Sequence, residues 1–152
     1  MKWIFVGLII GFLVGFFMNF SFTGEVVNDS KMAFVTKIVD GDTLVIEGGD
    51  HVRLLGIDTD ERGHTCYDVA KERLSELVLG KEVNVEFGPE RTDQYGRLLA
   101  YILLDGDNIN LRMISEGYAV ARFFPGNEKY KEEIVIAEKN AILNKIGCKW
   151  NK

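Results

Sequence analysis

The sequence predicts an α+β fold: a five-stranded Greek-key β-barrel of the OB type with three helices, preceded by one N-terminal transmembrane helix. Three observations lead to this prediction. Short β-branched runs and helical patterns follow the order three strands, helix, two strands and two helices. The chain has 152 residues, enough for one domain with a substantial core and too few for two. Residues 3–22 form an apolar run without charge. An open α+β sheet is the alternative arrangement of the same elements.

The strands are expected where β-branched or alternating apolar residues stand between turn signals. Asp40-Gly41-Asp42 is a turn, and Gly48-Gly49-Asp50 is a tight hairpin connection. The predicted strands are Met32–Val39, Thr43–Glu47, His51–Ile57, Glu82–Phe87 and Leu98–Leu104.

The helices are expected where apolar residues recur at helical spacing. Glycine is the residue directly after each of these segments, as is typical of helix ends. The predicted helices are Cys66–Leu79, Ile109–Glu116 and Lys129–Ile146.

Residues 1–23 are expected to form a membrane anchor or signal sequence, and residues 24–31 a polar linker to the barrel domain at 32–152. About 20 apolar residues in a helix match a hydrocarbon core of about 30 Å. The run exceeds a usual signal core and lacks an Ala-x-Ala site, which favours an anchor over cleavage and secretion. Lys2 precedes the run, and Glu25 and Asp29 follow it. We therefore expect the domain on the extracytoplasmic side of the membrane.

Cys66 and Cys148 are the two cysteines of the chain and lie far apart in sequence. In an oxidising compartment they could close a long loop as a disulfide. Two unrelated buried thiols are the alternative. Export, if it occurs, favours the disulfide.

The net charge of −5 argues against a broad basic face of the kind that many nucleic-acid binders carry. Any recognition of phosphate must therefore be local, with cations gathered in a cleft.

Two acidic clusters bracket the second and third predicted strands. Asp40 and Asp42 precede them, and Asp58, Asp60 and Glu61 follow. Each cluster alone also fits an ordinary turn or polar loop. One hairpin separates them, so both lie at the same end of adjacent antiparallel strands. Crowded carboxylates repel one another, and a bound cation would remove this cost. Hard oxygen ligands suit Ca²⁺ or Mg²⁺ rather than zinc.

Two arginines and a pair of phenylalanines complete the candidate site. Arg53 stands inside an apolar run, where it either reaches out of the barrel face or is buried with a partner. Arg97 opens the fifth predicted strand. Each guanidinium could bind a phosphate through two parallel hydrogen bonds, although a solvent-facing or loop arginine is the alternative. Phe123 and Phe124 could stack on a base, and packing at the rim of the core is equally consistent with the sequence.

Three blocks of sequence resemble the staphylococcal nuclease (thermonuclease) family in order and spacing. They are V-D-G-D-T, V-R-L-L-G-I-D-T-D-E and D-Q-Y-G-R-L-L-A-Y, and the resemblance extends from Phe34 to Trp150. It implies Ca²⁺-dependent hydrolysis of DNA and RNA, with cleavage of the 5′ P–O bond and 3′-phosphate products. The alternative is an inactive nucleic-acid-binding module tethered to the membrane, expected to lack at least one of the family's main site residues.

The resemblance also implies a role for each matching residue. Asp42 and Asp58 would bind Ca²⁺ with their carboxylates, and Thr59 with its backbone carbonyl. Glu61 stands where the family has its general base, or the residue that orients the attacking water.

The remaining matches concern the substrate. Arg53 and Arg97 match the two phosphate-binding arginines, which act with Glu61 in catalysis. Tyr95 resembles the tyrosine beside the nucleotide's terminal phosphate, and Asp40 an acidic residue behind the metal ligands.

The sequence departs from the family at several points. Asp60 replaces a usual proline, and its role is not evident from the sequence. Phe123 and Phe124 take the place of the tyrosines that enclose the base, which retains stacking and removes hydroxyl groups. The stretch between Glu61 and the first helix is also shorter than in the type enzyme, so the loop over the site differs.

Overall fold

The structure is a computed structural model and describes residues 29–151. The predicted anchor or signal sequence at 1–23, and most of the predicted linker, lie outside this range. Within it, no helix has the length and apolar character needed to cross a bilayer.

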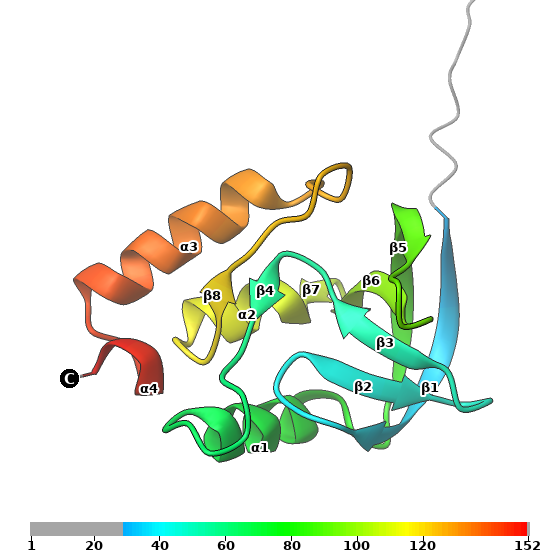
Figure 1. Cartoon of the computed structure of the whole chain (residues 1–152), viewed down its shortest axis with the longest axis horizontal. Helices are drawn as coiled ribbons and strands as arrows, with labels where there is room; N and C mark the ends of the chain where they lie inside the picture. Colours follow the sequence, from blue (N-terminus) through cyan, green and yellow to red (C-terminus); the bar gives the residue numbers. More distant parts are fainter. Residues whose placement is uncertain (1–28, 152) are drawn as a thin grey trace, which may run out of the picture.

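Eight strands and four helices make up the described part of the chain (Figure 1). The strands are β1 Ser30–Ile38, β2 Thr43–Ile46, β3 His51–Leu54, β4 Ile57–Asp58, β5 Glu82–Thr92, β6 Leu98–Leu104, β7 Asp107–Asn108 and β8 Val120–Ala121. The helices are α1 Tyr67–Val78, α2 Ile109–Ser115, α3 Lys131–Leu143 and α4 Gly147–Trp150.

β1, β2, β3, β5 and β6 form a closed barrel, which confirms the predicted α+β architecture and excludes an open sheet. Their neighbours pair antiparallel, except that β3 pairs with β6 in parallel and so closes the sheet on itself. Asn110 of α2 is fully buried beside this seam and donates to the carbonyl oxygens of Leu55 (2.8 Å) and Ala100 (3.3 Å). Apolar side chains from every barrel strand fill the interior.

The third predicted strand is interrupted after Leu54. Leu55 and Gly56 form a turn, and β4 follows it to pair with β8 rather than with a barrel strand. Gly56 has a φ of +78°, and a Cβ there would lie 2.6 Å from the Cδ1 atom of Ile134. The turn therefore needs glycine both for its backbone conformation and for the close approach of α3. This break directs Asp58 away from the barrel.

Other element bounds differ from the prediction because of pairings that lie far apart in sequence. β1 begins at Ser30, inside the predicted linker, because Ser30 pairs with Glu86. β5 continues past Gly88-Pro89 to Thr92 through a register shift against β6, a bulge that tolerates proline. β7, β8 and α4 were not predicted, since elements of two to four residues have too few positions to show a period.

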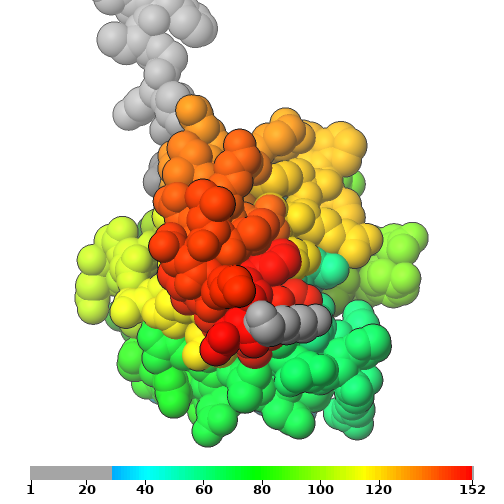
Figure 2. All heavy atoms as spheres, turned by 90° about the vertical axis from the view of Figure 1, so that its left-hand side faces the viewer, coloured from blue at the N-terminus to red at the C-terminus, as the bar shows by residue number. Residues whose placement is uncertain are grey.

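The C-terminal segment is fastened to the segment that leads from β4 into α1. Cys66 and Cys148 form a disulfide, and the Lys149 ammonium pairs with the Asp60 carboxylate. Figure 2 shows α4, in red, in contact with the green atoms of the α1 region. Three helices were predicted; the structure adds α4 as a fourth, and its role is to carry these two links. The paired cysteines confirm the disulfide over two free thiols.

Candidate active site

A cleft of about 600 Å³ opens where the β1–β2 turn, β4, the β5–β6 turn and the segment after β8 meet. It contains eight of the residues that the sequence predicted as site residues. Its lining residues are Asp40, Asp42, Arg53, Asp58, Glu61, Glu90, Asp93, Gln94, Tyr95, Arg97, Leu99, Arg122 and Phe124.

Arg53 lies at the bottom of the cleft, and its side chain is only 8% exposed. Its Nε atom lies 3.2 Å from Asp42 Oδ1, and its Nη2 atom donates to Asp58 Oδ1 at 2.9 Å. Nη1 donates to the backbone carbonyl oxygens of Leu54 and Ile57. The guanidinium therefore joins both acidic clusters, and most of its N–H groups are already bound within the protein. The sequence left open whether Arg53 is exposed or buried with a partner, and the structure buries it between two aspartates. Few of its N–H groups therefore remain for the two parallel hydrogen bonds to phosphate that the sequence interpretation assigned to it.

Asp42 is held in place from β3 and from the loop after β4. Its backbone carbonyl accepts a hydrogen bond from the Leu54 N–H at 2.8 Å. Its Oδ2 atom accepts from the Thr59 N–H (2.8 Å) and the Thr59 hydroxyl (3.0 Å). Gly41 allows this approach, because a Cβ there would meet the Thr59 side chain at 2.8 Å. The two acidic segments are thus packed directly against each other, as the sequence predicted.

Burial raises the pKa of the Asp42 carboxyl above its ordinary value, and the neighbouring Asp40 raises it further. Arg53 and the hydrogen bonds from Thr59 act in the opposite direction but do not cancel the rise. The surrounding groups therefore do not fully compensate for the burial of an ionised Asp42 carboxylate. A hard cation with oxygen ligands would supply that charge.

The metal ligands that the resemblance implies are close together but not arranged as a finished metal site. In residues 29–151, no group of three or more His, Cys, Asp or Glu side chains is placed to hold a metal ion. Asp58 is occupied by two arginines, with Oδ1 bound to Arg53 and Oδ2 to Arg122. The donors fit Ca²⁺ in kind, since the two carboxylates of Asp42 and Asp58 and the Thr59 carbonyl are all hard oxygen ligands.

Glu61 lies in the same cleft, is exposed, and makes no side-chain hydrogen bond or ion pair with the described residues. Its backbone carbonyl accepts from the His64 N–H at 3.0 Å, which orders the start of the loop. A carboxylate without a protein partner at the edge of a cleft is free to accept a proton from water.

Arg97 is positioned by a tight turn that Asp93 holds together. Asp93 Oδ1 accepts from the backbone N–H groups of Tyr95 (2.9 Å) and Arg97 (3.0 Å), and Oδ2 pairs with Arg97 Nε at 2.7 Å. Although burial opposes it, these hydrogen bonds lower the pKa of the Asp93 carboxyl. Tyr95 is 75% exposed, and its ring centre lies 5.6 Å from the Arg97 guanidinium. Arg97 and Tyr95 therefore both line the cleft, on the turn that Asp93 holds together.

The family model described as staphylococcal nuclease homologue matches residues 51–152 of this chain. The chain belongs to the staphylococcal nuclease family. The thermonuclease of Staphylococcus intermedius is 36% identical over 131 residues, which cover 78% of this chain and 75% of that protein. The thermonuclease of Staphylococcus hyicus is 29% identical over 163 residues, covering 93% and 94%. The endonuclease YncB of Bacillus subtilis is 36% identical over 138 residues, covering 82% and 65%.

Phe123 and Phe124 have different surroundings in the fold of this nuclease-family chain. Phe124 lines the cleft and is 40% exposed. Phe123 packs against the hydrophobic core and lies near Gly56. Of the two roles that the sequence allowed, packing against the core therefore holds for Phe123, which is not among the residues that line the cleft. Phe124 remains available for stacking.

Five residues of the cleft lining were not predicted as site residues, and Arg122 and Asp93 are the two that contact predicted ones through their charged groups. Arg122 contacts Asp58 across 64 positions of sequence, and nothing near it in the chain indicates this partner. Asp93 opens a turn in the block D-Q-Y-G-R, and an aspartate at that place commonly binds the backbone two residues on. That signal could have identified Asp93 as the residue that holds Arg97.

Asp60, whose role the sequence left open, is a structural link. One carboxylate oxygen pairs with Lys149, and the other accepts from the Cys66 N–H at 3.1 Å. The hydrogen bond from Lys149 is the main reason that the pKa of Asp60 lies below its ordinary value. Asp60 thus joins the loop of Glu61 to α1 and α4, and it does not line the cleft.

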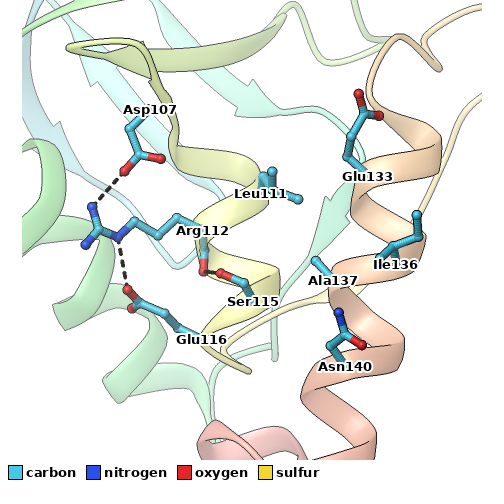
Figure 3. Close-up of a pocket in the computed structure, with 9 residues that line it drawn as sticks. All are labelled: Asp107, Leu111, Arg112, Ser115, Glu116, Glu133, Ile136, Ala137 and Asn140. Atoms are coloured by element: carbon cyan, nitrogen blue, oxygen red, sulfur yellow. Dashed lines mark hydrogen bonds and ion pairs between the residues drawn. The ribbon is translucent and has the colours of Figure 1, made fainter.

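A second hollow lies between α2 and α3, and its chemistry is different (Figure 3). Arg112 lines this hollow, and its guanidinium forms ion pairs with Asp107 at 2.7 Å and with Glu116 at 3.0 Å. Leu111, Ala137 and Ile136 contribute apolar surface. The acidic cleft is therefore the better candidate for phosphate chemistry.

Proposed function

We propose that this protein is a Ca²⁺-dependent endonuclease that hydrolyses DNA and RNA phosphodiester bonds to 3′-phosphate ends, outside the cytoplasm. Membership of the staphylococcal nuclease family and relatives named thermonuclease and endonuclease support the nuclease activity. The observation that carries the proposal is one cleft that contains the Asp42–Arg53–Asp58 cluster, Arg97 and a Glu61 carboxylate without a protein partner.

The proposed reaction is an in-line attack of water on the phosphorus atom. Glu61 accepts a proton from this water, a new P–O bond forms, and the bond from phosphorus to the 5′ oxygen breaks. The 5′ oxygen leaves with the bonding electron pair and takes a proton from solvent water to become a hydroxyl, and the phosphate stays on the 3′ side. Arg97 and the remaining N–H of Arg53 donate to the phosphate oxygens as negative charge develops there. Bound Ca²⁺, held by Asp42, Asp58 and the Thr59 carbonyl, would supply further positive charge at the phosphate.

We also propose that the domain is exported and tethered to the membrane by the run at residues 3–22, with secretion after cleavage as the alternative. The Cys66–Cys148 disulfide supports export, because such bonds persist in oxidising compartments.

The test is cleavage of labelled single-stranded DNA and RNA by the full chain in detergent, with Ca²⁺ and with EDTA. Glu61→Gln is expected to lower kcat about 100- to 10,000-fold through loss of the proton acceptor. Arg97→Ala is expected to lower it about 100- to 1,000-fold through loss of charge stabilisation. The products should accept a 5′ label without prior dephosphorylation, since they carry 5′ hydroxyls.

The matched control is Glu72→Gln, which changes an exposed glutamate of α1 away from the cleft and should leave the rate unchanged. Activity that persists in EDTA, or Glu61→Gln activity equal to that of the wild type, would refute the proposed mechanism. Binding of DNA without hydrolysis under every metal condition would instead identify an inactive binding module.

A further inference from the structure

We propose that Arg122 forms a second phosphate subsite of this cleft, which binds the phosphate next to the scissile one in a polynucleotide chain. The proposal rests on the nuclease function above. It makes Arg122 a residue that favours polymers over substrates with a single phosphate.

The backbone of Arg122 is fixed beside Asp58. β8 pairs antiparallel with β4, so that Val120 lies opposite Asp58, and the Arg122 N–H donates to the Gly56 carbonyl at 2.9 Å. The guanidinium Nη1 lies 3.0 Å from Asp58 Oδ2, and its Cζ atom lies 5.8 Å from the centre of the Phe124 ring. The side chain is thus held at the cleft by an ion pair and an aromatic face.

The three arginines of the cleft differ in exposure. The side chain of Arg53 is 8% exposed, that of Arg97 32% and that of Arg122 57%. Arg53 has most of its N–H groups bound within the protein. Arg122 uses only Nη1 for a side-chain hydrogen bond to the described residues. Arg97 also uses only one guanidinium N–H group, Nε, for a side-chain hydrogen bond to the described residues, and Arg122 is the more exposed of the two.

The cleft has a net negative charge, so a polynucleotide needs a positively charged side chain near the cleft entrance to bind. Six carboxylates and three arginines line it, so a polyanion meets an excess of negative charge on approach. Arg122, the most exposed of the three, is best placed to offset this repulsion for the part of the chain outside the cleft.

Little free energy is lost when the Arg122 guanidinium leaves the Asp58 carboxylate and binds a phosphate instead. Asp58 keeps its contact with Arg53 when Arg122 moves away, so no carboxylate loses its last partner. The Arg122–Asp58 pair is largely exposed on the arginine side, and exposed ion pairs contribute little to stability because water screens them. A guanidinium can bind a phosphate through two parallel hydrogen bonds, which is a stronger interaction.

The experiment measures binding of a fluorescein-labelled dodecathymidylate by anisotropy, with Ca²⁺, in the full-length Glu61→Gln variant so that binding is read without cleavage. Adding Arg122→Ala should weaken binding about tenfold, as expected for loss of a charged hydrogen bond. It should also reduce the slope of log K against log salt by about 0.7, the value for one phosphate of a single strand. Arg122→Lys should restore the slope. A dinucleoside monophosphate, with one phosphate, should compete equally well in all variants.

Arg91→Ala is the matched control, because Arg91 is also about half exposed, pairs with one aspartate (Asp29) and lies over one phenylalanine ring (Phe87), but does not line the cleft. It should leave both affinity and slope unchanged. An unchanged slope in Arg122→Ala, an equal loss for dodecamer and dinucleotide, or absence of dodecamer binding would each overturn the proposal. Absence of hydrolysis by the wild type, with the slope change intact, would refute the nuclease activity alone.

Discussion

Reduction of the Cys66–Cys148 disulfide is expected to destabilise the domain strongly. The bond joins residues 82 positions apart, so it restricts more than half of the chain in the unfolded state. The chain-entropy relation for a loop of this length gives about 4.5 kcal/mol at 25 °C. The native state should change little on reduction, because Lys149 still pairs with Asp60 and its N–H still donates to the Gly117 carbonyl at 3.1 Å.

The assay is urea unfolding of the full chain in mild detergent, followed by far-ultraviolet circular dichroism, with and without a phosphine reductant. Reduction should lower the free energy of unfolding by about 4 kcal/mol. It should also increase the m-value, because an unfolded chain without the cross-link exposes more surface.

A Cys66→Ala/Cys148→Ala variant provides the control and should not respond to the reductant. A loss of less than about 1 kcal/mol on reduction would refute the reasoning. It would mean that the ion pair and backbone contacts of α4 already restrict the same segments.

Two further predictions concern the acid range and the location of the domain. Asp60 has a folded-state pKa below its ordinary value of 3.8, so its contribution to stability is present above that pH and is lost as the pH falls through the lower folded-state value. Asp60→Asn should therefore lower stability at pH 6 and reduce the further loss between pH 5 and pH 3 in urea titrations; equal acid slopes in both proteins would contradict this. For location, protease added to intact cells should digest the barrel domain while a cytoplasmic marker survives, and full protection of the domain would argue against export.

Local residue patterns were enough to predict the barrel and most of the cleft. The Asp-Gly and Gly-Gly turns, together with β-branched runs, identify the strands of the barrel. These local signals do not depend on how the helices pack around it. The clusters at Asp40/Asp42 and Asp58/Glu61 are close in sequence and separated by one hairpin. Antiparallel pairing of β2 with β3 brings the two segments to the same end, and the Asp42–Thr59 hydrogen bonds join them beyond the turn at Gly56.

The remaining features depend on partners that local patterns do not reveal. Phe123 and Phe124 look alike in sequence, and only the packing around Gly56 and the core decides which one faces the cleft. The two-residue pairing of β4 with β8 is equally invisible, although it brings Arg122 to Asp58.

The sequence by itself determined the fold class and the acidic and basic residues of the candidate site, because turn chemistry and strand alternation act over a few neighbouring residues. The tertiary structure decided how those residues are used. It bound Arg53 between two aspartates, linked Asp60 to a lysine 89 positions away, and added Arg122 to the cleft. The physical reason is that a charged side chain is neutralised by whichever groups lie near it in space, and the closed barrel brings together groups that are distant in the chain.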